Sequence, residues 1–419
     1  MNTPSHPSLK TWGTTDNPVD PDLVTKLSHP TMGVPSVIST DAGLSSAVAA
    51  LASQSGDLAV DTERASGFRY GQDAYLIQLR RGHGPTYLID PRSLSDLSLL
   101  SDALQDCTWI LHAADQDLPC MRAVGLAAPR LFDTELAARL LSRSRVGLGH
   151  VIKETLGWSL AKEHQQADWS TRPLPSTWLA YAALDVELLE ELRDALTVEL
   201  EQAGKLKWAE QEFEHVRTAP PKPVDPEPWR KVPGFSSVRT DRGREIVKQL
   251  WTVREEIAQE LDVIPRVVVA HEGLIMAAQQ QPSSRKQLDR IRYFHTRTAR
   301  PYLQQWWQAL DRAMKTPPTS LPTKRAVHPE GYIPKPVSWH RHHEDRFERL
   351  TVVKSVVQEI AKEINVPQEN VLAPATQREL AWRYHAGVDV DALLIGADVR
   401  PWQRELVSRR LTDALRQHG

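Results

Sequence analysis

Two carboxylates that could hold a metal ion, Asp61 and Glu63, stand two residues apart at the end of the apolar run Leu58–Val60. Alternate side chains of a β-strand point to the same face, so both carboxylates would extend together from a buried strand. Like charges this close raise each other's proton affinity unless a cation neutralises them. Because hard divalent cations favour oxygen ligands, the pair predicts a metal site, with a strand that runs into an acidic turn as the alternative.

Two further acidic residues, Asp115 and Asp117, follow the strand-like segment Trp109–His112. They stand where a helix is expected to begin, and acidic side chains are also favoured there by the helix dipole. Either residue could therefore add a carboxylate to the same site or simply stabilise the start of the helix.

A tyrosine and an aspartate, Tyr181 and Asp185, are four residues apart in a long predicted helix. We expect this helix to begin near Ser176 or Thr177, which suit the N-cap, and to run to about Ala203. Residues four apart on a helix are neighbours on one face, so the phenol and the carboxylate would lie side by side.

The composition limits the class of protein. At 419 residues the chain is longer than one typical core can organise, which predicts two or three domains. No apolar run is long enough to span a bilayer and the first residues lack a signal-peptide core, so we expect a cytoplasmic protein with no membrane segment. Cys107 and Cys120 are too few for a disulfide framework or a four-cysteine zinc site, which fits a reducing compartment.

Charge is distributed unevenly along the chain. Residues 1–200 contain 16 Lys and Arg against 25 Asp and Glu, whereas the remainder contains 35 against 28. An acidic first half and a basic second half suit a metal-dependent site joined to modules that hold a polyanion, although random scatter is the alternative for so modest a bias.

Alternating strand and helix patterns in the first half predict an α/β fold, with a mixed sheet flanked by helices. Three neighbouring strands separated by turn-forming residues predict an antiparallel meander within that sheet. The predicted strands are 58–63, 74–79, 86–89 and 109–112, and the predicted helices include 42–53, 95–104, 136–141 and 147–156.

Two proline-rich segments divide the rest of the chain, and proline-rich segments typically form extended spacers. The predicted organisation is a mobile N-terminal arm at 1–35, an α/β domain at 36–215, a linker at 216–235, a helical domain at 236–316, a linker at 317–344 and a second helical domain at 345–419.

The two helical segments repeat each other. The sequence Glu256–Val263 matches Glu359–Val366 at an offset of 103 residues, and Val268–Ala270 matches Val371–Ala373 at the same offset. Internal repetition of this kind indicates duplicated small domains, so we predict two all-α helical bundles.

The acidic residues and the tyrosine lie in stretches that resemble the tyrosine-bearing branch of the DEDD superfamily of 3′-5′ exonucleases and, within it, the ribonuclease D family. The resemblance covers nearly all of residues 40–205 and implies a ribonuclease H-like exonuclease domain. The stretches that carry it are Ala59–Glu63, Leu76–Leu79, Leu88–Pro91, Leu111–Leu118, Asp168–Leu174 and Tyr181–Asp185.

By resemblance, four carboxylates bind two Mg²⁺ or Mn²⁺ ions, and Tyr181 orients the attacking water. Such a metal pair supplies what phosphodiester hydrolysis needs at neutral pH. Asp117 is preferred to Asp115 because in the family the acid directly precedes a leucine, as Asp117 does here. The predicted metal ligands are Asp61, Glu63, Asp117 and Asp185. Candidate substrate contacts in family-like stretches are Gln78, His112 and Arg172, for which hydrogen bonding within the core or a loop is the alternative.

The helical pair resembles the helicase-and-RNase-D C-terminal (HRDC) domain in tandem, which implies nucleic-acid binding, with protein binding or bracing of a neighbouring domain as the alternatives. The tryptophans Trp306, Trp382 and Trp402 occur in apolar stripes and are predicted to lie in the core. Candidate nucleic-acid contacts, with a solvated helix face as the alternative, are Arg285, Lys286, Arg290, Arg292 and Arg297 in the first copy and Arg400, Arg404, Arg409 and Arg410 in the second.

The resemblance implies a metal-dependent 3′-5′ exoribonuclease that trims the single-stranded 3′ end of structured RNA, such as transfer RNA precursors, to 5′-mononucleotides. The sequence does not fix the oligomeric state, and a monomer is favoured. Neither a G-x-S-x-G elbow nor a P-loop occurs, so no serine-hydrolase mechanism and no nucleotide cofactor is indicated. A DNA 3′-5′ exonuclease of repair and a non-catalytic nucleic-acid-binding protein are the alternatives.

Overall fold

The structure, a computed structural model, describes residues 24–161, 166–324 and 331–418. These residues form two compact units, each with its own core. The first unit contains the described residues up to Glu63 together with 74–220 and 333–418, and the second contains 64–73 and 221–332.

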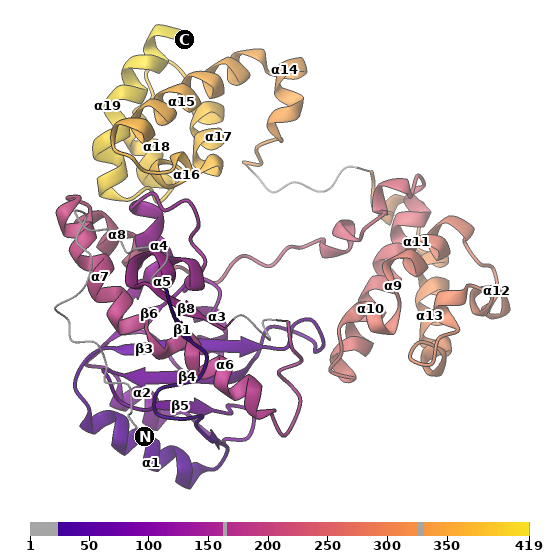
Figure 1. The fold of residues 1–419 in the computed structure, drawn as a ribbon. Helices are drawn as coiled ribbons and strands as arrows, with labels where there is room; N and C mark the ends of the chain where they lie inside the picture. The colour runs from indigo at the N-terminus through magenta and orange to yellow at the C-terminus, as the bar shows by residue number, and fades with distance from the viewer. Residues whose placement is uncertain (1–23, 162–165, 325–330, 419) are drawn as a thin grey trace. The chain divides into compact units, whose positions relative to one another are not determined.

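A mixed six-stranded sheet with the order β2-β5-β4-β3-β6-β7 forms the centre of the first unit (Figure 1). Strands β4 and β5 are antiparallel, whereas the β2–β5, β3–β6 and β6–β7 pairs are parallel. The predicted α/β sheet is therefore confirmed, including the antiparallel β4–β5 hairpin. The strands are β1 Thr25–Leu27, β2 Val37–Ile38, β3 Leu58–Arg64, β4 Ala74–Arg81, β5 Thr86–Ile89, β6 Thr108–Leu111, β7 Arg130–Asp133 and β8 Trp158–Leu160.

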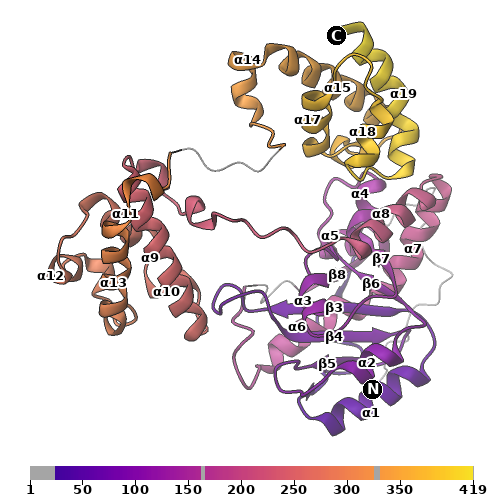
Figure 2. The same cartoon turned by 180° about the vertical axis from the view of Figure 1, so that it is seen from behind.

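Helices cover the sheet, with α6 against β4 and β5, α7 against β6, and α8 against β7. Figure 2 shows the strands β3, β4 and β5 side by side from the opposite direction. The helices of this part of the chain are α1 Asp41–Ser53, α2 Ser98–Ala103, α3 Leu118–Ala123, α4 Thr134–Leu140, α5 Leu148–Leu156, α6 Ser176–Glu187, α7 Leu189–Gln202 and α8 Leu206–Thr218.

The single helix predicted from Ser176 to Ala203 is wrong, because the structure has two helices, α6 and α7, that meet at Leu188. The backbone of Leu188 is not helical, with φ −117° and ψ 12°. Buried Arg80 of β4 donates a hydrogen bond to the carbonyl oxygen of Glu187. This carbonyl therefore accepts from a side chain of the sheet. The break lets the two helices cover different strands, although the leucine stripe continues across it. The N-cap of α6 is Pro175, which has no side-chain hydrogen bond to the helix.

A short strand lies in the segment predicted to be a mobile arm. Strand β1 pairs in parallel with β8, and Leu27 at its end is buried. Thr31 then donates its hydroxyl to the carboxylate of Glu187. The prediction of mobility is therefore wrong for residues 24–35, and residues 1–23 lie outside the described residues.

Two helical bundles with the same order of helices follow in the chain. Each begins with a helix of 20 residues, α9 or α15, and a residue of left-handed backbone stands two positions after the end of that helix. This residue is Asp262 (φ 49°) in the first bundle and Asn365 (φ 48°) in the second, again 103 residues apart. The first bundle contains α9 Asp241–Glu260, α10 Pro265–Val268, α11 His271–Gln280, α12 Arg285–Asp289 and α13 Leu303–Lys315. The second contains α15 Glu344–Glu363, α16 Gln368–Val371, α17 Pro374–Arg383, α18 Val390–Gly396 and α19 Pro401–His418, preceded by α14 Trp339–His342.

The cores of the bundles extend into the segments predicted to be linkers. Trp229 is buried in the core of the first bundle, and Trp339 is fully buried beside the second. Trp306 and Trp402 are buried as predicted, whereas Trp382 is only partly buried. None of the helices within the described ranges is both long and apolar enough to cross a bilayer.

Candidate active site

Three carboxylates converge at the end of β3. One oxygen each of Asp61, Glu63 and Asp185 lies within 4.8 Å of the others. Asp61 and Glu63 are alternate residues of β3 and so extend from one face of the strand. Asp185 comes from α6, the helix that packs on β4 and β5. The structure therefore brings together three of the four acids that the sequence selects.

Tyr181 stands one helical turn before Asp185 on α6, and the two side chains are hydrogen-bonded. Its ring packs beside Trp169, with the ring centroids 6.3 Å apart. The four-residue spacing in the sequence thus places the phenol next to the carboxylate cluster.

Burial and mutual repulsion raise the proton affinity of the cluster. Burial, followed by the charges of Asp117, Asp185 and Glu63, raises the pKa of Asp61 well above its usual value. Burial raises the pKa of Asp185 to about 7, although the hydrogen bond from Tyr181 acts in the opposite direction. Burial and the charge of Asp185 also raise the pKa of Tyr181, so its hydroxyl keeps its proton at neutral pH.

Asp117 occupies the N-cap position of α3 and is buried, whereas Asp115 is exposed. Its carboxylate accepts a hydrogen bond of 2.6 Å from the hydroxyl of Thr62, the residue between Asp61 and Glu63. It is not one of the three acids whose oxygens lie within 4.8 Å of one another, but its charge acts directly on Asp61. Asp117 thus borders the cluster, and the sequence-based preference for it over Asp115 agrees with its burial.

A buried aspartate that sequence analysis did not select shapes the turn before Asp117. The carboxylate of Asp133 accepts hydrogen bonds from the backbone of Ala113 and Ala114, at 3.1 and 2.8 Å. It also caps α4 by accepting from Glu135 and Leu136. Burial raises the pKa of Asp133 to about 6. Its only sequence signal was the position at the start of a predicted helix, which does not reveal that it holds the left-handed Ala113, with φ 61°.

Two of the three predicted substrate contacts have partners within the protein. The guanidinium of Arg172 pairs with Asp90 at 2.7 Å and donates to the backbone carbonyls of Tyr75 and Trp169. The ring of His112 hydrogen-bonds to Thr134 at 2.9 Å and to the backbone of Val146, and burial lowers its pKa to about 4. These contacts support the alternative, in which both residues brace the fold around the site.

Gln78, the third predicted substrate contact, is fully buried on β4. Neither its Oε1 nor its Nε2 has a hydrogen-bond partner within the described part of the chain. The side chain is therefore not placed to touch a substrate directly.

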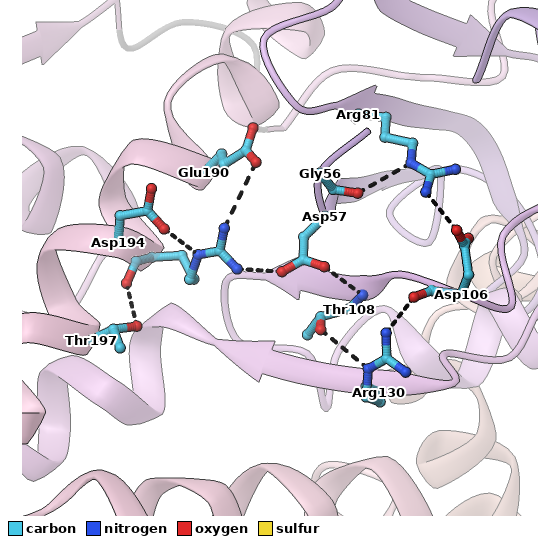
Figure 3. Close-up of polar contacts among 10 residues, drawn as sticks. Gly56, Asp57, Arg81, Asp106, Thr108, Arg130, Glu190, Asp194 and Thr197 are labelled. Carbon is cyan, nitrogen blue, oxygen red and sulfur yellow. Dashed lines mark hydrogen bonds and ion pairs between the residues drawn. The ribbon is translucent and has the colours of Figure 1, made fainter. Parts of the chain in front are cut away.

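Polar contacts fix the end of β3 that lies opposite the acidic cluster (Figure 3). Asp57 accepts a hydrogen bond of 2.8 Å from the backbone of Thr108 and forms an ion pair with Arg193 of α7. Arg81, the last residue of β4, donates to the carbonyl of Gly56 at 3.1 Å. Because these contacts join β3 to β4, β6 and α7, they hold β3 in register and with it the acidic pair.

The donor set fits divalent metal ions. Carboxylates this close repel one another, and this repulsion adds to burial in raising the pKa of Asp61. A hard divalent cation that takes oxygen ligands would remove it. Asp61, Glu63 and Asp185 can therefore hold such a cation, with Asp117 and Tyr181 beside it.

This combination of a mixed sheet, a helix-borne tyrosine and converging acids matches the class of 3′-5′ exonucleases. A family model for 3′-5′ exonuclease matches residues 35–201. The HRDC domain model matches residues 244–310, and a model for the 3′ to 5′ exonuclease C-terminal domain matches residues 332–415.

The particular family follows from individual relatives. Ribonuclease D of Desulfotalea psychrophila is 30% identical over 270 residues, which cover 63% of this chain and 71% of that protein. Three other ribonucleases D are matched over 58–62% of their own length. The chain belongs to the ribonuclease D family.

Solved structures agree with this assignment. A protein from Bifidobacterium adolescentis is similar with a TM-score of 0.87 and 35% identity, covering 94% of this chain and 100% of that one. Escherichia coli RNase D, an exoribonuclease involved in structured RNA processing, is similar with a TM-score of 0.67 and 25% identity. That match covers 91% of this chain and 98% of the E. coli chain.

Proposed function

We propose that this protein is a metal-dependent 3′-5′ exoribonuclease that removes 5′-mononucleotides from single-stranded 3′ ends of structured RNA. The observation that carries the proposal is the convergence of Asp61, Glu63 and Asp185 beside Tyr181. Membership of the ribonuclease D family supports RNA over DNA as the substrate. E. coli RNase D is involved in structured RNA processing, and among structured RNAs the family resemblance points to precursors of transfer RNA as the proposed substrates.

In this proposal the four acids hold two divalent ions, Mg²⁺ or Mn²⁺. When bound, the ions supply charge stabilisation at phosphorus and a more acidic water. Tyr181 remains protonated and donates its hydroxyl to Asp185. Its oxygen can then accept a hydrogen bond from the attacking water and so orient it. Thr62 holds the Asp117 carboxylate at the edge of the cluster, so that this acid keeps one orientation.

The two helical bundles are proposed to be tandem HRDC domains, of which the first matches the HRDC model. The matching helix order and the left-handed residues Asp262 and Asn365 support a common origin for both. We propose that they grip the body of the RNA. The proposed segments are the exonuclease domain at 36–215 and the helical domains at 236–316 and 345–419. Each helical domain also includes a buried tryptophan from the linker before it, Trp229 or Trp339.

The test is a time course with purified Asp185→Asn protein on a transfer RNA precursor with a 3′ tail, in Mg²⁺, Mn²⁺ or chelator. We expect the rate of nucleotide release to fall by roughly a thousandfold or more, because the cluster loses a charged ligand. RNA binding and the melting temperature in chelator should change little. Asp115→Asn, which removes an exposed carboxylate close to the site in sequence, is the matched control and should retain activity.

Undiminished hydrolysis by Asp185→Asn would refute the catalytic assignment. RNA and DNA oligomers of the same sequence, assayed in parallel with the unmodified protein, test the choice of substrate. Faster hydrolysis of the DNA would replace the proposed activity with that of a DNA exonuclease.

A further inference from the structure

The side chain of Gln78, on β4 of the candidate active-site region, lacks a hydrogen bond within the described part of the chain. It is 0% exposed, and both its carboxamide oxygen and its carboxamide nitrogen are unpaired. A buried amide without partners lowers stability, and most buried polar side chains in proteins have at least one partner. An apolar residue of similar size would suit the fold alone better, so the amide requires an explanation.

The register of the sheet places Gln78 opposite Asp61. Strands β3 and β4 are neighbours in the sheet, and the backbone N–H of Gly82 donates to the carbonyl of Asp57 at 3.1 Å. This bond joins the end of β4 to the start of β3, so the two strands are antiparallel. Counting from the Asp57–Gly82 pair along both strands brings Asp61 and Gln78 directly opposite each other.

The two side chains also share one face of the sheet. Directly opposite residues of antiparallel strands point to the same side, with Cβ atoms roughly 4.5–5.5 Å apart. Arg80, two residues further along β4 and so on the same face as Gln78, donates to the carbonyl of Glu187 at the end of α6. The amide therefore lies between the sheet and α6, the helix that also carries Asp185.

Arg172 and His112 provide a contrast, since their polar atoms are used within the fold. At Gln78 the nearest acid in the sheet is Asp61. A carboxylate has two oxygens, so Asp61 can direct one toward the carboxylate cluster and the other toward the adjacent strand. Metal-ligating carboxylates are commonly oriented by a hydrogen bond of this kind, and loss of the donor typically weakens metal affinity by about 10- to 100-fold.

We propose that Gln78 is a positioning residue for Asp61, whose ionised carboxylate accepts a hydrogen bond from the Gln78 amide when the cluster holds divalent ions. This inference rests on the proposed function, because it assumes that the cluster binds metal. Gln78 then contributes to metal affinity at the expense of stability in the metal-free protein, and it does not touch the RNA.

The test uses Gln78→Met and Gln78→Leu, which keep a large apolar side chain and remove both polar atoms. Two quantities are measured on the full chain: the melting temperature in chelator, and the Kd for Mn²⁺ by titration calorimetry. We expect the melting temperature to stay the same or rise, because an unpaired buried amide is removed. We expect the Kd for Mn²⁺ to rise by about tenfold or more.

A matched control is Gln377→Met, because Gln377 is also buried but donates a hydrogen bond of 2.7 Å to the carbonyl of Leu372. This change should lower the melting temperature and leave Mn²⁺ binding as it was. A lower melting temperature in both Gln78 variants would overturn the inference, since the amide would then stabilise the fold itself. An unchanged Kd would overturn it as well.

Failure of the inference can be told apart from failure of the proposed function. If the unmodified protein binds Mn²⁺ and Asp185→Asn weakens that binding while the Gln78 variants do not, only the role of Gln78 is refuted. If Asp185→Asn leaves Mn²⁺ binding unchanged, the cluster is not the metal site, and both proposals fail.

Discussion

The two helical bundles share one order of helices but differ in how their arginines are used. In the first bundle, the five residues Arg285, Lys286, Arg290, Arg292 and Arg297, here called the cationic surface, are all exposed. None of the five forms an ion pair within the described residues, and Asp289 is the only acid between 281 and 300. In the second bundle, the predicted contacts Arg400, Arg404 and Arg410 pair with Glu212, Asp391 and Glu363.

The second bundle belongs to the same compact unit as the exonuclease domain and packs on helix α8 of that domain. The carboxylate of Glu212, which is buried on α8, accepts hydrogen bonds of 2.8 Å from both Arg400 and the indole of Trp402. Trp402 in turn stacks on Trp208, with the ring centroids 4.9 Å apart. The two bundles therefore differ: arginines of the second are used in contacts within the protein, whereas the cationic surface of the first is exposed. An exposed surface of this charge is where the proposed contact with RNA phosphates would be made.

The largest expected effect comes from breaking the contact of the second bundle with α8. Glu212→Ala should lower the free energy of unfolding by about 3 kcal/mol, because Arg400 and the Trp402 indole lose their shared acceptor in a largely buried site. Urea unfolding followed by tryptophan fluorescence measures this change.

Glu214→Ala on the same helix is the matched control, since Glu214 is exposed and its ion pair is with Arg217, three residues further along α8. Its effect should stay below about 1 kcal/mol. Equal effects of the two changes would mean that the second bundle is held to α8 by other contacts. The pairing of Arg400 with Glu212 would then not distinguish the second bundle from the first.

Replacing residues of the cationic surface is expected to have a smaller effect, and this effect is on RNA affinity. Lys286→Glu, Arg290→Glu and Arg297→Glu together should raise the Kd for a 3′-tailed RNA by about 10- to 100-fold, through lost phosphate contacts. The dependence of log K on log salt should become shallower by about two, from roughly 0.7 per lost contact. Filter binding with Asp185→Asn protein measures affinity without hydrolysis.

The control for this prediction replaces Arg404, Arg409 and Arg410 of the second bundle with glutamate. All three arginines already form ion pairs, Arg404 with Asp391, Arg409 with Asp413 and Arg410 with Glu363, so their replacement should change RNA affinity far less. A larger loss of affinity from the second set would reverse the assignment of roles to the two bundles.

Local patterns in the sequence predict the elements of the first unit well but not their interruptions. The strand around Leu58–Val60 and the helix over Asp41–Ser53 follow from periodicity, which is a local property. The break at Leu188 depends on Arg80, which is more than a hundred residues away in the chain and takes the carbonyl of Glu187. No local pattern contains that information. The same holds for β1, whose partner β8 is distant in sequence.

For the candidate site, spacing and resemblance selected Asp61, Glu63 and Asp185, whose oxygens converge in the structure. This was possible because D-x-E on a strand and Y-x-x-x-D on a helix fix relative positions. They could not separate the predicted contacts Gln78 and Arg172, since both are polar residues in family-like stretches. Only tertiary contacts reveal that Arg172 is bound to Asp90 while Gln78 has no partner among the described residues. Asp133 was missed because its four backbone partners come together only through folding.

The smallest expected effect concerns Lys205, a second contact between the exonuclease domain and the second bundle. Its buried ammonium donates hydrogen bonds of 2.8 Å to two carbonyls, that of Leu140 in the exonuclease domain and that of Asn365 in the second bundle. Lys205→Met should lower the free energy of unfolding by about 1–2 kcal/mol, because both carbonyls lose a donor. Lys207→Met, two residues away and exposed, should have almost no effect.

The difference in free energy of unfolding between the unmodified protein and Lys205→Met depends on pH, and this dependence gives an independent check. Burial lowers the pKa of Lys205 below its usual 10.5. At a pH between the lowered pKa of Lys205 in the folded protein and its usual pKa in the unfolded chain, the unfolded chain binds more protons than the folded protein. Folding therefore becomes more favourable as the pH rises through that range. A neutral amine still donates two hydrogen bonds, so the contact survives the loss of the proton. The stability difference between the unmodified protein and Lys205→Met should therefore widen toward pH 10.5. A difference that narrows instead would mean that Lys205 acts as a charge and not as a donor to the two carbonyls.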